Sequence, residues 1–123
     1  MNIREINNNL PLLHSLYKCP GNSERNILFS HLDDKSFKFL CQCIQKCIAD
    51  PSILKLSNPH LSRIRKTLVQ DKDRVNYAIK SGRVTKNKRI AIRQSGEGIG
   101  LLLGVLAPVL ISLVKDLITK KKK

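Results

Sequence analysis

Seven residues of this chain have thiol or imidazole side chains, the groups that carry redox chemistry or bind transition metals such as zinc. They are Cys19, Cys41, Cys43, Cys47, His14, His31 and His60. Three of the cysteines lie within seven residues of one another in an expected helix, without a CxxC pair or a CxxxH group, and the histidines are scattered. This spacing is typical of reduced thiols in the apolar core of a cytosolic or nuclear protein rather than of a disulfide framework. We therefore expect no metal site and no cofactor.

Residue groups typical of an enzyme active site are not found in the sequence. There is no nucleophile elbow, phosphate-binding loop, metal-ligand cluster or recognisable pair of carboxylates. The sequence therefore favours a binding or structural protein over an enzyme.

Positive charge is concentrated in the second half of the chain, which has a formal net charge of +14 overall. Between Leu61 and Arg93, only Asp71 and Asp73 oppose a set of eleven cations. These are Arg63, Arg65, Lys66, Lys72, Arg74, Lys80, Arg83, Lys86, Lys88, Arg89 and Arg93. Cations that meet phosphates release counterions, so this stretch predicts DNA binding through the backbone, without sequence preference. Tyr77 is its one aromatic residue, which argues against a base-stacking platform. A solvated charged helix face is the alternative.

The chain ends in an apolar segment followed by lysines, and this segment is the candidate for contact with a lipid membrane. Gly98 to Ile118 spans 21 residues, which is about 31 Å as a helix against about 30 Å for a bilayer core. The residues expected to contact lipid are Ile99, Leu101, Leu102, Leu103, Val105, Leu106, Val109, Leu110, Ile111, Leu113, Val114, Leu117 and Ile118. A small or polar residue recurs at every fourth position from Gly100 to Asp116, and Pro108 introduces a kink. Such a helix can lie in the interface, insert obliquely or assemble into pores.

The elements that position these residues are expected to be helices, because no strand-like alternation is present. Pro11 kinks or restarts the first helix, Asn22 or Ser23 caps the second, and Asp33 or Asp34 caps the third. A fourth helix follows Ser57 or Asn58, continuous or broken near Asp71, and ends at Gly82; Thr85 caps a short basic helix. The expected fold class is all-α: a small multi-helix bundle, a basic helical segment and a separate apolar C-terminal helix. The expected division is a helical core (1–56), a basic helical segment (57–94), a glycine-containing linker (95–98) and a membrane-active helix with a lysine tail (99–123).

The terminal segment "GIGLLLGVLAPVLISLVKDLITKKKK" resembles lytic peptides of the melittin type. It shares with them a Gly-Ile-Gly start, a Val-Leu step, a central proline and a lysine-rich end. Asp116 departs from that pattern. The resemblance implies a helix that disrupts membranes.

The linker before this segment resembles the cleavage sites of adenovirus-type maturation proteases, which cut a Gly-X-Gly before its last glycine. The matching residues are Gly96, Glu97 and Gly98, whereas Gln94 stands where such sites prefer Leu, Ile or Met. The resemblance implies cleavage after Glu97, which would release the apolar segment.

Over most of its length the chain resembles small basic proteins of polinton and adintovirus elements, which are adenovirus-related. The stretches that carry this resemblance are "NLPLLHSLYK", "FLCQCIQKCI", "LSRIRKTL", "VTKNKRIAI" and the glycine-bounded tail. It implies a minor virion component that coats DNA or helps the particle breach a membrane, with capsid protein and a maturation protease as partners. It also implies a location in the virion, in the host nucleus or cytoplasm during assembly, and at membranes on entry.

Three hypotheses follow. The first is a viral structural protein in which a basic helical region binds DNA or a capsid surface and a masked terminal helix disrupts membranes. The second is a tail-anchored membrane protein with a basic helical domain. The third is a soluble helical adaptor whose terminal helix packs back on the domain or on another copy in a homo-oligomer, with Gly100 and Gly104 allowing close helix contact.

Overall fold

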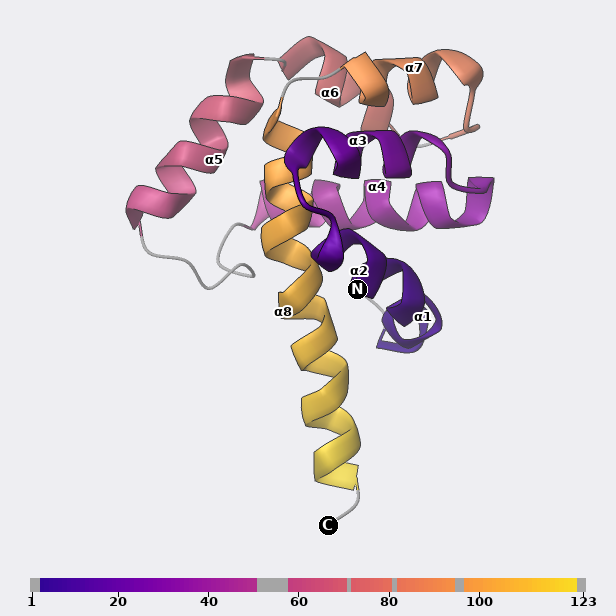
Figure 1. Cartoon of the computed structure of the whole chain (residues 1–123), viewed down its shortest axis with the longest axis vertical. Coiled ribbons are helices and arrows are strands. Elements are labelled where there is room, and N and C mark those ends of the chain that lie inside the picture. The colour runs from indigo at the N-terminus through magenta and orange to yellow at the C-terminus, as the bar shows by residue number, and fades with distance from the viewer. Residues whose placement is uncertain (1–2, 51–57, 71, 81, 95–96, 122–123) are drawn as a thin grey trace.

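The computed structural model describes residues 3–50, 58–70, 72–80, 82–94 and 97–121, and within these ranges it contains eight helices and no strand. The helices are α1 (Ile3–Asn8), α2 (Leu10–Lys18), α3 (Asn22–Ser30), α4 (Asp34–Ala49), α5 (Asn58–Gln70), α6 (Lys72–Ile79), α7 (Lys86–Gln94) and α8 (Glu97–Lys121). Figure 1 shows their arrangement. The predicted all-α class is confirmed.

Local sequence signals explain most helix boundaries. The first helical segment is divided into α1 and α2, with Pro11 in the first turn of α2, where a missing backbone N–H costs nothing. Asp33 is the N-cap of α4. The Thr85 hydroxyl accepts a hydrogen bond of 3.2 Å from the backbone N–H of Lys88, which is the capping geometry predicted for α7. The helix predicted to end at Gly82 ends earlier, because α6 stops at Ile79. Gly82 itself has a φ of 122°, a backbone conformation that favours glycine, in the segment that leads to α7.

One N-cap prediction is corrected. Gly21, rather than Asn22 or Ser23, is the N-cap of α3, and Asn22 is already helical. Of the two alternatives for the segment after Asn58, the structure has the broken one: α5 ends at Gln70 and α6 begins at Lys72, with position 71 outside the described residues. The predicted cap at Ser57 lies outside the described residues, and Asn58, the other predicted cap, is the first residue of α5.

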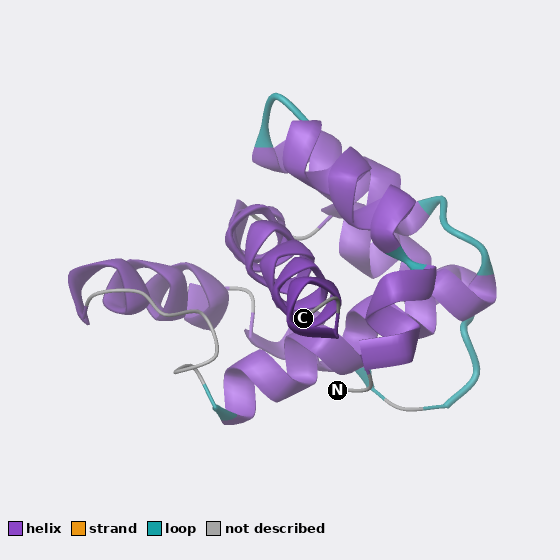
Figure 2. Cartoon of the chain, turned by 90° about the horizontal axis from the view of Figure 1, so that it is seen from below, coloured by secondary structure: helices purple, strands orange, loops and turns teal. Residues whose placement is uncertain are grey.

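The C-terminal helix α8 lies among the other helices. It contacts α1, α2, α3 and α5, and the view from below shows other helices on several sides of it (Figure 2). The C-terminal apolar helix is confirmed as an element of its own, and it packs within the bundle instead of standing apart from it. The physical reason is that eight of its apolar side chains are fully or nearly fully buried, which removes a large apolar area from water.

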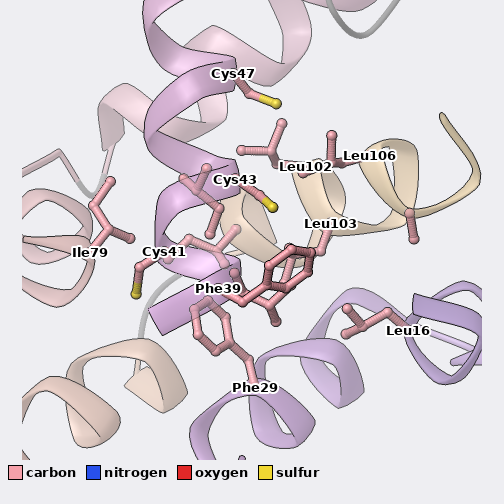
Figure 3. Close-up of a cluster of buried hydrophobic side chains, with 14 of the residues drawn as sticks. Leu16, Phe29, Phe39, Cys41, Cys43, Cys47, Ile79, Leu102, Leu103 and Leu106 are labelled. Atoms are coloured by element: carbon pink, nitrogen blue, oxygen red, sulfur yellow. The ribbon is translucent and has the colours of Figure 1, made fainter. Parts of the chain in front are cut away.

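The hydrophobic core combines α8 with the amphipathic face of α4. Phe37, Leu40 and Ile44 on α4 are each at most 1% exposed. Phe29 of α3 packs on Phe37 with ring centroids 4.7 Å apart. Figure 3 shows Cys43 and Cys47 pointing from α4 toward the leucines of α8, while Cys41 points to the side of Ile79. The core therefore draws on residues from the beginning, middle and end of the chain.

Candidate nucleic-acid interface

Nine of the eleven predicted DNA-binding cations lie on the surface. They are Arg63, Arg65 and Lys66 on α5, Lys72 and Arg74 on α6, Lys80 and Arg83 after α6, and Lys86 and Arg93 on α7. The opposite sides of these helices carry the buried apolar side chains Ile64, Val75, Ile79 and Ile92. Because the apolar stripes face the core, the cations between them must face solvent. The structure therefore brings cations from three helices and one loop onto the outer surface of α5, α6 and α7.

Lys88 is the first of two cations that instead serve the fold. Its side chain is 8% exposed, and its ammonium group donates a hydrogen bond of 2.9 Å to the carbonyl of Lys80. Lys88 lies one helical turn before Ile92, which is fully buried, so both residues share the inward face of α7.

Arg89 is the second. Its guanidinium donates to the carbonyls of Ser30 (3.2 Å) and Leu32. It also forms an ion pair of 2.7 Å with Asp34 and lies over the Phe37 ring at 5.2 Å from the centroid. Arg89 therefore joins α7 to the end of α3 and the start of α4, and it presents little charge for a DNA phosphate.

An open groove lies among the exposed cations. It has a volume of about 860 Å³, and its lining includes Val69, Lys72, Arg74, Tyr77 and Gln94. The guanidinium of Arg74 donates a hydrogen bond of 2.6 Å to the carbonyl of Gln94, and this bond links α6 to the end of α7. Its described lining holds the cations Lys72 and Arg74, the carboxylate of Asp73 and one aromatic side chain, Tyr77. One aromatic residue does not provide serial stacking of bases, so contact with a backbone suits the groove better.

The predicted lipid-contacting residues of α8 lie mostly inside the protein. The buried ones are Ile99, Leu102, Leu103, Leu106, Leu110, Ile111 and Val114. Leu101, Val105, Val109 and Leu113 are partly buried, and the side chains of Leu117 and Ile118 lie outside the described residues. By length and composition, Gly98–Asp116 is a segment that could cross a membrane, and more than half of it is buried in the protein. Lipid contact through this face would require α8 to separate from its neighbours.

The small residues of α8 form its contact with α3. A β-carbon on Gly100 would overlap the carbonyl oxygen of Asn22 and stand 2.8 Å from the Asn22 carbonyl carbon. A β-carbon on Gly104 would stand 2.8 Å from Cζ of Arg25. The two glycines therefore let α3 approach α8 closely. Arg25 was missed by sequence analysis, because nothing in its local pattern shows which distant helix it contacts.

The predicted cleavage site lies at the start of α8. Gly96 is outside the described residues, Glu97 is the first residue of the helix, and Gly98 is buried. The bond after Glu97 is therefore in the first helical turn, and a protease that cuts exposed, extended chain would need that turn to open.

The cysteines are free thiols, three of them buried. Burial raises the pKa of Cys41 and Cys43 to about 12 and that of Cys47 to about 11. These groups are therefore neutral and apolar in character, in the core position predicted for them. Among the described residues, no group of three His, Cys, Asp or Glu side chains could hold a metal ion.

No family model, curated protein or solved structure matches this chain. The resemblances to viral proteins and to lytic peptides stay predictions, and function has to be argued from the arrangement of cations and apolar surface.

Proposed function

We propose that this chain is a non-enzymatic protein that binds the DNA backbone through the exposed cations of α5, α6 and α7. In this proposal it acts as a minor structural component of a virion of the polinton or adintovirus type. The observation that supports DNA binding is that nine exposed cations lie on consecutive helices and their connection, and that the apolar sides of these helices pack in the core. Of the eleven predicted cations, Lys88 is buried and Arg89 is half-buried against α3 and α4, whereas Arg74 stays exposed while it donates to the Gln94 carbonyl.

The physical basis of this binding is neutralisation of phosphates. Each exposed cation that meets a phosphate releases a counterion, so affinity falls steeply with salt and depends little on base sequence. Base-edge readout needs an element inserted in a groove, and no recognition-helix signature is present. The protein would thus coat or compact DNA instead of selecting a site.

Fluorescence anisotropy of labelled duplexes tests this function. The full chain should bind duplexes of different sequence with similar affinity, and affinity should fall by at least about a hundredfold between about 50 and 200 mM salt. Salt-insensitive binding, or no binding at low salt, would refute the proposal. A neutral polymer of similar length controls for non-electrostatic association.

A second function is favoured by α8 itself. Gly98–Asp116 is apolar enough to cross a membrane, but its close packing with α3 depends on two glycines: Gly100 lies against the backbone of Asn22 and Gly104 against the side chain of Arg25. We propose that α8 is a membrane-active helix held inside the bundle until it separates, for example after cleavage following Glu97. The cost of separation is exposure of its buried leucines to water, which a lipid phase would offset.

Dye release from liposomes distinguishes this function from its alternatives. A peptide of residues 98–123 should release dye, and the full chain should release less. If neither releases dye but the full chain pellets with lipid and resists carbonate extraction, a tail anchor is the better interpretation. If neither binds lipid, α8 is a packing helix of a soluble adaptor or of a homo-oligomer.

A further inference from the structure

A small pocket lies where α4 meets the turn between α6 and α7. Its volume is about 170 Å³, well above the roughly 30 Å³ that a water molecule occupies in the liquid. Three lysines line it: Lys38 and Lys80 are exposed, and Lys88 is the buried residue. The backbone of Gly82 forms another part of the lining, and a β-carbon on Gly82 would stand 4.0 Å from the ammonium nitrogen of Lys88.

The ammonium group of Lys88 has unused capacity to donate hydrogen bonds. It carries three hydrogens, and the Lys80 carbonyl accepts one of them at 2.9 Å. Among the described residues it makes no ion pair and no further hydrogen bond. Removing an ammonium from water is costly unless it is paired, so this position favours an additional acceptor with negative charge.

None of the described residues that line the pocket has an acidic side chain to supply that charge. Its other polar residues are Cys41, Gln42 and Gln45. The side-chain amide of Gln45 donates a hydrogen bond of 2.6 Å to the Ile79 carbonyl, so one of its N–H groups already has an acceptor. Burial raises the pKa of Cys41 to about 12, so its thiol is neutral and donates toward the Ala78 carbonyl. The described lining therefore contains three lysines and no carboxylate.

We propose that this pocket binds a tetrahedral oxyanion, a phosphate group, with Lys88 at its base and Lys38 and Lys80 at its rim. The oxygens of a phosphate accept hydrogen bonds from several donors at once, and bonds between charged groups are the stronger ones. The pocket shares Lys80 with the proposed DNA interface, but its buried residue, Lys88, is not one of the nine exposed cations.

Isothermal titration calorimetry of the full chain with inorganic phosphate, at constant ionic strength, tests the site. We expect saturable binding of one phosphate per chain. Lys88→Met should weaken binding by at least about tenfold, as expected for loss of a charged hydrogen bond. Lys86→Met is the matched control, because Lys86 is on the same helix, is exposed and does not line the pocket; its phosphate affinity should equal that of the wild type.

The variant with both Lys38→Gln and Lys80→Gln keeps the test independent of the stability of Lys88→Met. Both residues are exposed, so the fold should persist, and phosphate affinity should fall several-fold. Unchanged affinity in this variant, equal affinity in Lys88→Met and Lys86→Met, or uptake of many phosphates without saturation would overturn the proposal. Loss of DNA affinity in Lys86→Met with intact phosphate binding would separate this site from the proposed DNA interface.

Competition identifies the source of the phosphate. A nucleoside monophosphate that displaces inorganic phosphate, when the matching nucleoside does not, points to a phosphate monoester as the ligand. If neither competes, the pocket is a site for the free anion. Displacement by the nucleoside itself would contradict recognition of phosphate.

Discussion

Gly104 of α8 lies directly against the guanidinium group of Arg25 in α3. A β-carbon on Gly104 would stand 2.8 Å from Cζ and 2.9 Å from Nη1 of Arg25. The same guanidinium donates to the carbonyls of Leu16 (2.9 Å) and Cys19 (3.1 Å), at the end of α2, and to the side chain of Asn22 (2.7 Å). One arginine thus joins the end of α2, the start of α3 and the middle of α8.

Enlarging Gly104 should therefore destabilise the fold. In Gly104→Leu the new side chain would displace Arg25 from its three acceptors, and we expect the free energy of unfolding to fall by about 2–3 kcal/mol. Urea denaturation measures this. Ser112→Leu is the matched control, since Ser112 is exposed on the same helix, and equal stability of the two variants would contradict the packing described here.

Removing Arg25 tests whether this contact restrains α8. Arg25→Ala leaves the sequence of α8 unchanged but loosens its packing on α2 and α3, so the full chain should release more dye from liposomes than the wild type. Lys35→Ala, at an exposed position on α4, should behave as the wild type does. If Arg25→Ala unfolds more readily without any increase in dye release, a membrane role for α8 is not supported.

Arg89 should matter more for stability than its ion pair suggests. Asp34 is 72% exposed, so the pair itself contributes at most about 1 kcal/mol, whereas charged hydrogen bonds to carbonyls contribute about 1.5–3 kcal/mol. We expect Arg89→Ala to lower the free energy of unfolding by about 3 kcal/mol, and Asp34→Asn by about 0.5 kcal/mol. Thermal or urea unfolding checks both. Equal losses would mean that the ion pair, and not the carbonyls of Ser30 and Leu32, holds α7.

The burial of three cysteines should make their thiols slow to react in the folded protein. At about pH 8, Cys41, Cys43 and Cys47 should react with a disulfide reagent only on unfolding, because burial keeps them protonated and enclosed. Their pKa values are raised from 9.0. Above pH 9 the thiols of the unfolded chain ionise while the buried thiols of the folded protein stay neutral, which favours unfolding. The free energy of unfolding therefore keeps its full value below pH 9 and falls as the pH rises through about 11 to 12. Stopped-flow absorbance follows the reaction, and equally fast reaction of all four cysteines in the native protein would contradict this burial.

Sequence alone predicted the parts of the fold that depend on local patterns. The amphipathic face of α4, the restart at Pro11, the cap at Thr85 and the turn at Gly82 all follow from residues close in the chain. The position of α8 does not, because an apolar helix has the same composition whether lipid or protein covers it. Its partners are set by shape, namely the two glycines that admit α3.

The candidate interface, too, was predictable only where local sequence determines it. Charge density identified the basic helices, but only packing separates Lys88 and Arg89 from the nine cations on the surface. The position of Lys88 one turn before Ile92 was an available signal for its burial. No local signal indicated that Arg89 reaches the carbonyls of Ser30 and Leu32, since these lie more than 50 residues away in the chain.

The salt dependence of duplex DNA affinity, measured for a variant of α5, tests the central claim most directly. Arg63, Arg65 and Lys66 are exposed on that helix, and replacing all three with Gln leaves the buried Ile64 in place. If these cations meet phosphates, the slope of log affinity against log salt should become shallower by about 2.7, or about 0.9 for each lost contact. An unchanged slope, with the variant folded, would show that α5 does not contact the DNA backbone and would contradict the account.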